Sequence, residues 1–195
     1  NATDMEGALS SYFEGIRRYE AFDSNNKNLP VLYASIISTY YNLGKYETAL
    51  GYCERSYAKS MEMGNAASIM SSCINYGRVL LKLHKPEKAD IYFSKGKAMA
   101  DSLNNPYFQS KYYQVIGNAK FEEKKYDDAL SYFSTALPII KLTNAPFDIA
   151  SCYLWLGICK AYVKNFKAGR VYLDSAYAIA LQSDYIHIRK DVYLN

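Results

Sequence analysis

The sequence has 195 residues and a mass of 22.2 kDa, which is enough for one domain or for one short array of repeats. Half of its residues are hydrophobic and 22% are charged, a composition that excludes a chain without a folded core. The formal charge is +4, with 23 basic residues interspersed among 19 acidic ones. A nucleic-acid-binding face needs clustered Lys and Arg, so no nucleic acid is expected as a partner, although tyrosine rings can stack on bases.

The sequence repeats with a period of forty residues, and no insertion interrupts the register. Equivalent positions in successive periods form columns of similar residues. One column is Tyr12, Tyr52, Tyr92, Tyr132 and Tyr172; a second is Tyr33, Cys73, Tyr113, Tyr153 and Tyr193; a third, of small residues, is Ala49, Ala89, Ala129 and Gly169; a fourth, of bulky residues, is Tyr46, Pro86, Tyr126 and Phe166; a fifth is Ile37, Gly77, Gly117 and Gly157. The period therefore defines a repeat architecture.

Each period is expected to contain two helices. Apolar residues recur at spacings of three and four, as in Ile36, Tyr40 and Leu43, which is helical spacing. The segment 4–22 is expected to be the second helix of an incomplete repeat. Four complete repeats are expected to follow over 30–64, 65–104, 105–144 and 145–184, and 185–195 to begin a truncated repeat. About six turn residues in each period leave roughly 17 residues per helix.

Two kinds of turn separate the helices. Within a repeat, the first helix is expected to end at a short polar segment: Gly44-Lys45, His84-Lys85-Pro86, Lys124-Lys125 or Lys164-Asn165. Between repeats, the turns are expected at Ser24-Asn25-Asn26, Met63-Gly64-Asn65, Asn104-Asn105-Pro106 and Thr143-Asn144-Ala145-Pro146, because Asn and Gly tolerate a left-handed backbone and Pro suits a helix start. One helix pair cannot bury its apolar side alone, so the pairs must stack.

These residues resemble the tetratricopeptide repeat family. The resemblance is carried by Val115-Ile116-Gly117-Asn118, by Lys125–Phe133 with Ala136-Leu137, and in part by Leu156-Gly157 and Leu43–Leu50. It implies an all-α, right-handed superhelical solenoid of antiparallel helix pairs that binds peptides in a concave groove. The family's usual repeat has 34 residues, so the helices are longer here, as in versions found in bacterial signalling proteins.

The resemblance also implies that first helices line the groove. The groove-facing sets are then Val31, Ala34, Ser38, Tyr41 and Asn42; Ser71, Ile74, Arg78 and Lys82; Lys111, Gln114, Asn118 and Phe121; and Ser151, Leu154, Ile158 and Tyr162. The candidate peptide-binding residues are Tyr41, Asn42, Arg78, Lys82, Lys111, Gln114, Asn118, Phe121 and Tyr162. Three cations among them favour an acidic or carboxylate-bearing peptide. The alternative is an ordinary solvated helix face.

Two points refine this expectation. Asn118 matches one Asn position of the family's carboxylate-clamp members, but the full clamp constellation is absent. Among the aromatic residues, Tyr41, Tyr112 and Tyr162 lie off the main columns and are expected to contact a partner, whereas Trp155 is expected to pack between helices.

Catalysis finds little support in the sequence. His84 falls in a predicted turn and His187 near the end of the chain, so no nucleophile–base arrangement is indicated. The four cysteines lack C-x-x-C spacing and are expected to be packing residues, with no metal or cofactor.

The sequence thus predicts a non-catalytic protein- or peptide-binding scaffold. The alternative is a sensory or regulatory region of a larger bacterial signalling or transcription-regulating protein. The chain lacks an initiating Met, so we expect a longer parent protein. Its longest mostly apolar stretch, 150–158, is far short of the roughly 20 residues that a membrane span needs, so no membrane contact is expected from this segment. The compartment, cytoplasmic or extracytoplasmic, and the oligomeric state stay open.

Overall fold

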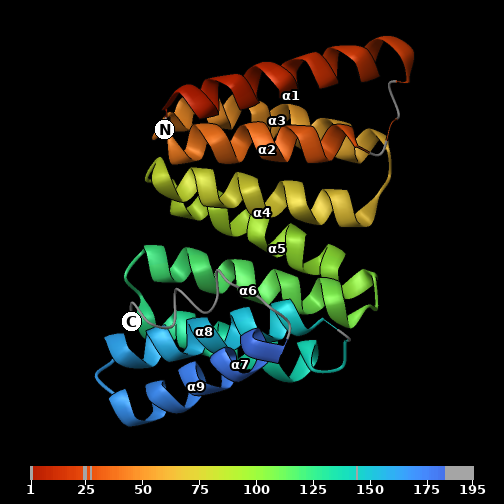
Figure 1. Cartoon of the computed structure of the whole chain (residues 1–195). Coiled ribbons are helices and arrows are strands. Elements are labelled where there is room, and N and C mark those ends of the chain that lie inside the picture. Colours follow the sequence, from red (N-terminus) through yellow and green to blue (C-terminus); the bar gives the residue numbers. More distant parts are fainter. Residues whose placement is uncertain (1, 24–25, 27, 144, 183–195) are drawn as a thin grey trace. The chain divides into compact units, whose positions relative to one another are not determined.

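The computed structural model describes residues 2–23, 26, 28–143 and 145–182, and every regular element within them is an α-helix (Figure 1). The helices are α1 (Ala2–Phe22), α2 (Leu29–Asn42), α3 (Tyr46–Glu62), α4 (Ala66–Lys82), α5 (Pro86–Ser102), α6 (Pro106–Glu122), α7 (Tyr126–Ile140), α8 (Pro146–Tyr162) and α9 (Phe166–Gln182). The all-α prediction is confirmed. The predicted truncated repeat over 185–195, with Tyr193, lies outside the described residues.

The helix bounds agree with the expected turns. Helices α3, α4, α5, α6, α8 and α9 each contain 17 residues. The helices form two compact units. The first ends at Leu103 and contains α1–α5, and the second starts at Asn104 and contains α6–α9. Within each unit every helix packs against the next one in the chain, and α2 also contacts α4. No helix in the described ranges is long and apolar enough to cross a membrane. The grouping into four forty-residue repeats stays a prediction.

The two helices of a pair approach closely because a residue with little or no side chain on one helix faces a large side chain on the other. A Cβ atom at Gly77 would lie 2.4 Å from the Phe93 ring, and one at Gly117 would lie 2.9 Å from the Phe133 ring. Phe133 is fully buried, so it has no room to move aside. The same two positions in the preceding pair of helices, α2 and α3, hold Ile37 and Cys53, which are both buried. A large residue thus stands opposite a small one, whichever helix carries it.

The turns inside the pairs share one backbone conformation. Gly44, His84, Lys124 and Lys164 all have positive φ, between 56° and 71°. The N–H of the following residue donates to a carbonyl five residues earlier, as from Lys45 to Tyr40 at 2.9 Å. These are Schellman-type helix ends, which satisfy carbonyls that the helix leaves unpaired. Only Gly takes this conformation without strain, and His and Lys occupy it here because the next helix must follow at once.

All four cysteines pack in the interior, as expected. They are free thiols and fully buried. Burial raises the pKa of Cys53, Cys152 and Cys159 to about 12, and that of Cys73 to about 11. The thiols therefore stay protonated and unreactive at neutral pH.

Adding a methyl group at Gly117 should destabilise the fold because it would overlap the buried Phe133 ring. We expect Gly117→Ala to lower the free energy of unfolding by about 1–3 kcal/mol, measured by urea denaturation followed by circular dichroism. The double variant Gly117→Ile/Phe133→Cys copies the Ile37–Cys53 pair. It should lose less stability than the two single changes added together, by about 1–3 kcal/mol. Additive losses would contradict the volume exchange.

Two glycines near the first turn should respond oppositely to alanine. Gly44 has φ 71°, whereas Gly51 is helical with nothing within 4 Å of an added Cβ. Gly44→Ala should cost about 1 kcal/mol because alanine is strained at positive φ. Gly51→Ala should stabilise by about 0.5–1 kcal/mol through better helix propensity. Thermal denaturation of the two single variants is the measurement, and a shift in the same direction for both would contradict the turn geometry.

Candidate functional site

The nine predicted binding residues divide between the two compact units. We call Tyr41, Asn42, Arg78 and Lys82 the first inner face, and Lys111, Gln114, Asn118, Phe121 and Tyr162 the second inner face. The first lies on α2 and α4, and the second on α6 and α8. Arg78 and Lys82 lie in the first compact unit and Lys111 in the second. The expected grouping of these three cations in one groove therefore stays a prediction.

An aromatic ring gathers two cations on the first inner face. Tyr41 lies in the last turn of α2, and its ring packs edge-on against Tyr46 at 5.5 Å between centroids. The Arg78 guanidinium carbon lies 4.7 Å from the centroid of the Tyr41 ring, and Lys82 Nζ lies 5.5 Å from it. The two cations stand one turn apart on α4, and the ring attracts both of them. Positive charge is therefore concentrated at this end of the face, next to the exposed Asn42.

The opposite end of the first inner face is apolar and hollow. A cavity of about 290 Å³ is lined by Pro30, Val31, Ala34, Ala67, Ser68, Ser71 and Ser72, which come from α2 and α4. Val31 is 62% exposed beside it. Small side chains leave this space, and the cavity could accept an apolar side chain of a partner.

The second inner face has a polar part on α6. Lys111 Nζ lies 3.5 Å from Asp148 Oδ1 in the first turn of α8, so the charge of Lys111 is largely balanced. Gln114 is only 6% exposed, and its Nε2 has no hydrogen-bond partner within the described part of the chain. One turn further along, the buried Oδ1 of Asn118 also lacks a partner among those residues. This part of the face thus buries one unsatisfied donor and one unsatisfied acceptor.

Gln114 is an exception to the repeat. Forty residues earlier the position holds Ile74, which is 3% exposed, and forty residues later it holds Leu154, which is 6% exposed. A buried apolar side chain therefore suffices for packing at this position. An amide with an unpaired donor costs about 1–3 kcal/mol there. The glutamine is not explained by packing.

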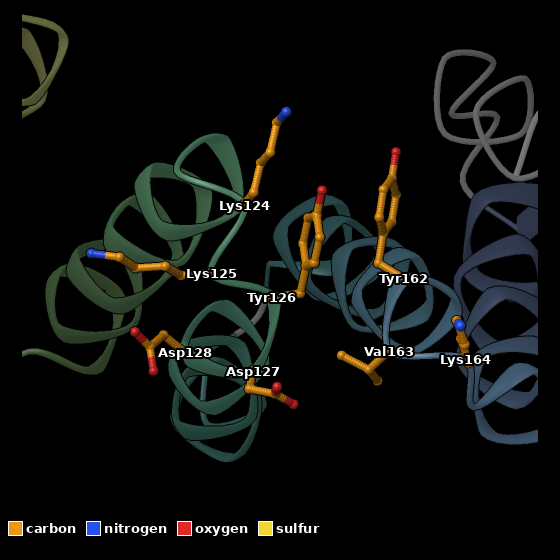
Figure 2. Close-up of a pocket in the computed structure, with 8 residues that line it drawn as sticks. All are labelled: Lys124, Lys125, Tyr126, Asp127, Asp128, Tyr162, Val163 and Lys164. Carbon is orange, nitrogen blue, oxygen red and sulfur yellow. The ribbon is translucent and has the colours of Figure 1, made fainter.

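Aromatic rings form the other end of the second inner face. The Phe121 ring lies 5.2 Å from Trp155, 5.0 Å from Tyr162 and 5.2 Å from Tyr126, and the rings of Tyr126 and Tyr162 are 4.5 Å apart. Figure 2 shows these two tyrosines side by side with their hydroxyls pointing the same way, beside Lys124. They line a hollow of about 640 Å³ with Lys124, Lys125, Asp127, Asp128, Val163 and Lys164. Because Tyr162 is 53% exposed, this end can receive a partner's side chain.

Five groove expectations were wrong. Ile74 is 3% exposed, Tyr112 5%, Gln114 and Leu154 6% and Ile158 8%, so none is available to a partner. Leu154 and Ile158 belong to a core cluster with Ala150, Ala176 and Ala180. The equivalent positions forty residues before and after Tyr112 hold Ser72 and Cys152, which are also buried. The small residues in this column were the sequence signal for a buried position.

Tyr126 lines the same hollow as Tyr162, although the sequence placed it only in the column of bulky residues. Its column holds Tyr46, Pro86 and Phe166, so nothing in the sequence singles it out. Trp155 packs between helices as expected, with its ring stacked on Phe133 at 5.8 Å and 4° between planes.

No family model matches the sequence. A curated relative, the chloroplast protein FLUORESCENT IN BLUE LIGHT of Arabidopsis thaliana, is 31% identical over 120 residues, which cover 58% of this chain and 35% of the relative. The chain thus spans about a third of that relative's length.

Two solved structures are similar over 98% of this chain and 53% of theirs. One is a Rap protein complexed with Competence and Sporulation Factor, with a TM-score of 0.81 and 14% identity. The other is a plasmid Rap conjugation gene regulator in complex with a Phr peptide, with a TM-score of 0.74 and 13% identity. The chain spans about half the length of each. The stacked helix pairs have the tetratricopeptide-repeat fold.

Replacing Gln114 by an apolar residue should stabilise the fold. The change Gln114→Leu installs the residue that the repeat carries at Leu154, and it removes an unpaired buried amide. We expect the free energy of unfolding to rise by about 1 kcal/mol, measured by urea denaturation. Gln114→Glu is the matched control and should destabilise, because it buries a charge. A loss of stability in the leucine variant would show that the amide serves packing.

Proposed function

We propose that this protein is a non-catalytic docking module that binds peptide segments of partner proteins on its inner faces. The observation that carries the proposal is the first inner face, where Arg78 and Lys82 stand over the Tyr41 ring at one end and an apolar cavity of about 290 Å³ lies at the other. Such a face matches a peptide that carries a carboxylate and an apolar side chain.

The side chains of the peptide would be selected at the ends of the faces. On the first inner face, Arg78 and Lys82 stand over the Tyr41 ring, and they would attract a carboxylate. On the second, the exposed ring of Tyr162 beside Tyr126 would receive an apolar or aromatic side chain. A peptide on the first inner face is therefore expected to be acidic, and a peptide on the second to carry a large apolar residue.

Two observations support a non-catalytic role. The buried cysteines have raised pKa values and cannot serve as thiolate nucleophiles at neutral pH. His84, the one histidine in the described ranges, occupies a helix-ending turn with φ 56°. These residues have structural duties in the fold.

A regulatory role within a larger protein is the second candidate. It is favoured by the Rap conjugation gene regulator, whose similar structure holds a peptide and whose chain is about twice as long as the matched part. Under that reading the same peptide would also change the conformation of the module. Small-angle scattering with and without peptide distinguishes the two, because a simple docking module should keep its radius of gyration.

Binding can be tested with a selected peptide. We expect selection of random twelve-residue peptides on the protein to enrich Asp and Glu, and the affinity of a selected peptide to fall about tenfold in Lys82→Glu and in Tyr41→Ala. Arg78→Glu should weaken binding similarly without lowering the melting temperature. The control is Arg17→Glu, which reverses a charge on α1, where the Arg17 side chain is 79% exposed. Equal affinity of all four variants would reject the inner faces as the site.

A further inference from the structure

A separate hollow lies on the second helices of the first compact unit. It has a volume of about 490 Å³, and its lining residues come from α3, α4, α5 and the turn before α5. We call it the outer hollow, and its lining residues are Leu50, Glu54, Tyr76, Leu80, Lys85, Lys88, Ile91, Tyr92 and Lys95. It shares no residue with either inner face. Its volume falls within the usual range of ligand pockets.

Packed aromatic rings make one wall of the outer hollow. The rings of Tyr76 and Tyr92 are stacked with centroids 3.9 Å apart, and the Tyr57 ring meets Tyr92 edge-on at 5.6 Å. The Tyr76 hydroxyl donates to Glu54 Oε1 at 3.3 Å. Burial raises the pKa of Tyr76, so its hydroxyl stays protonated and keeps this bond at neutral pH. These contacts prepare the wall without a ligand.

Positive charge surrounds the outer hollow. Lys85, Lys88 and Lys95 all line it, against one carboxylate, that of Glu54. Lys95 Nζ lies 5.2 Å from the centroid of the Tyr92 ring and 5.4 Å from that of Tyr57. All three lysines are exposed at the surface. An anionic group of a ligand could therefore contact them without costly burial.

Apolar surface lies beside the lysines. Ile91 is 55% exposed although it lines the hollow, and Leu50 and the buried Leu80 continue the apolar surface inward. An exposed isoleucine next to a cavity is a site where a ligand's apolar group would exclude water. The outer hollow thus combines an apolar surface with a cationic rim.

The fold does not require these lysines. Eighty residues later, in α9 and the turn before it, the equivalent positions hold Asn165, Ala168 and Ser175 instead of Lys85, Lys88 and Lys95. Tyr92 itself recurs as Tyr132 and Tyr172, so the ring serves packing in every repeat. Forty residues earlier these positions hold Lys45, Thr48 and Arg55, and forty residues later they hold Lys125, Asp128 and Thr135, so Lys88 is the cation of the rim that has no basic counterpart in another repeat.

We propose that the outer hollow is a second docking site, for an acidic peptide segment with one apolar side chain between carboxylates. The apolar side chain would lie on Ile91 and Leu50, and the carboxylates would reach Lys88 and Lys95. The carboxylate of Glu54 repels a continuous polyanion, which disfavours nucleic acid and an anionic membrane surface as occupants. A module with inner and outer sites joins two partners at once.

The probe is a seven-residue peptide with a central leucine, one glutamate on each side of it and uncharged residues at both ends, titrated into the ¹⁵N-labelled protein. We expect amide shifts in the segments 50–57, 76–80 and 85–95, separate from any shifts at the inner faces. Lys88→Glu/Lys95→Glu should weaken binding about tenfold or more, whereas Arg17→Glu/Lys167→Glu, with the same change in net charge, should not. A peptide with glutamine in place of glutamate should lose binding, and the Lys82→Glu variant should retain binding at the outer hollow. That last result separates this site from the proposed first inner face.

Three results would overturn the proposal. One is the absence of shifts at about 5 mM peptide, a concentration that detects millimolar affinity. Another is unchanged affinity in Lys88→Glu/Lys95→Glu when its melting temperature matches that of the parent. The last is binding of phosphatidylserine vesicles or of a twelve-nucleotide RNA that depends on Lys88 and Lys95 while the peptide does not bind, which would assign the hollow to a different class of ligand.

Discussion

The close contact between the two helices of each pair is the constraint on which the rest of the structure depends. Ala49, Ala89 and Ala129 are fully buried where the second helix meets the first, so no long side chain separates the helices. Next to them, Gly117 receives the ring of Phe133. Since the pair Ile37 and Cys53 reverses the sizes, the summed volume of the two positions sets the helix spacing, and neither column does so alone.

Residues outside this contact are free to differ between repeats. The two proposed sites lie at positions where they differ. Gln114 replaces the buried apolar residue of the neighbouring repeats, and Lys88 takes the position that Thr48, Asp128 and Ala168 hold in the other repeats. In a repeat protein each period provides a reference for what packing needs at a position. A costly or charged departure from it marks a position with another task.

Periodicity predicted the helices and their turns because both depend on local spacing. It could not show that His84 and Lys124 adopt the left-handed turn that Gly44 adopts, because the tertiary constraint of the next helix overrides their preference. Contacts such as that between Lys111 and Asp148 join residues on separate helices and depend on rotamers. The groove-facing stripe gave the direction of Ile158, but not the depth at which neighbouring helices bury it.

The two proposed sites would recognise a peptide by different physics. The exposed Tyr162 ring of the second inner face would bind an apolar side chain, which many sequences offer, so it would contribute affinity with little selectivity. Lysines around the exposed Ile91 would read side chains, and charge matching mainly raises association rate and rejects wrong partners. Salt would weaken the outer site, whose lysines are exposed, more than the contact at Tyr162, which carries no charge. Ionic strength would therefore shift the balance between the two partners of such a module.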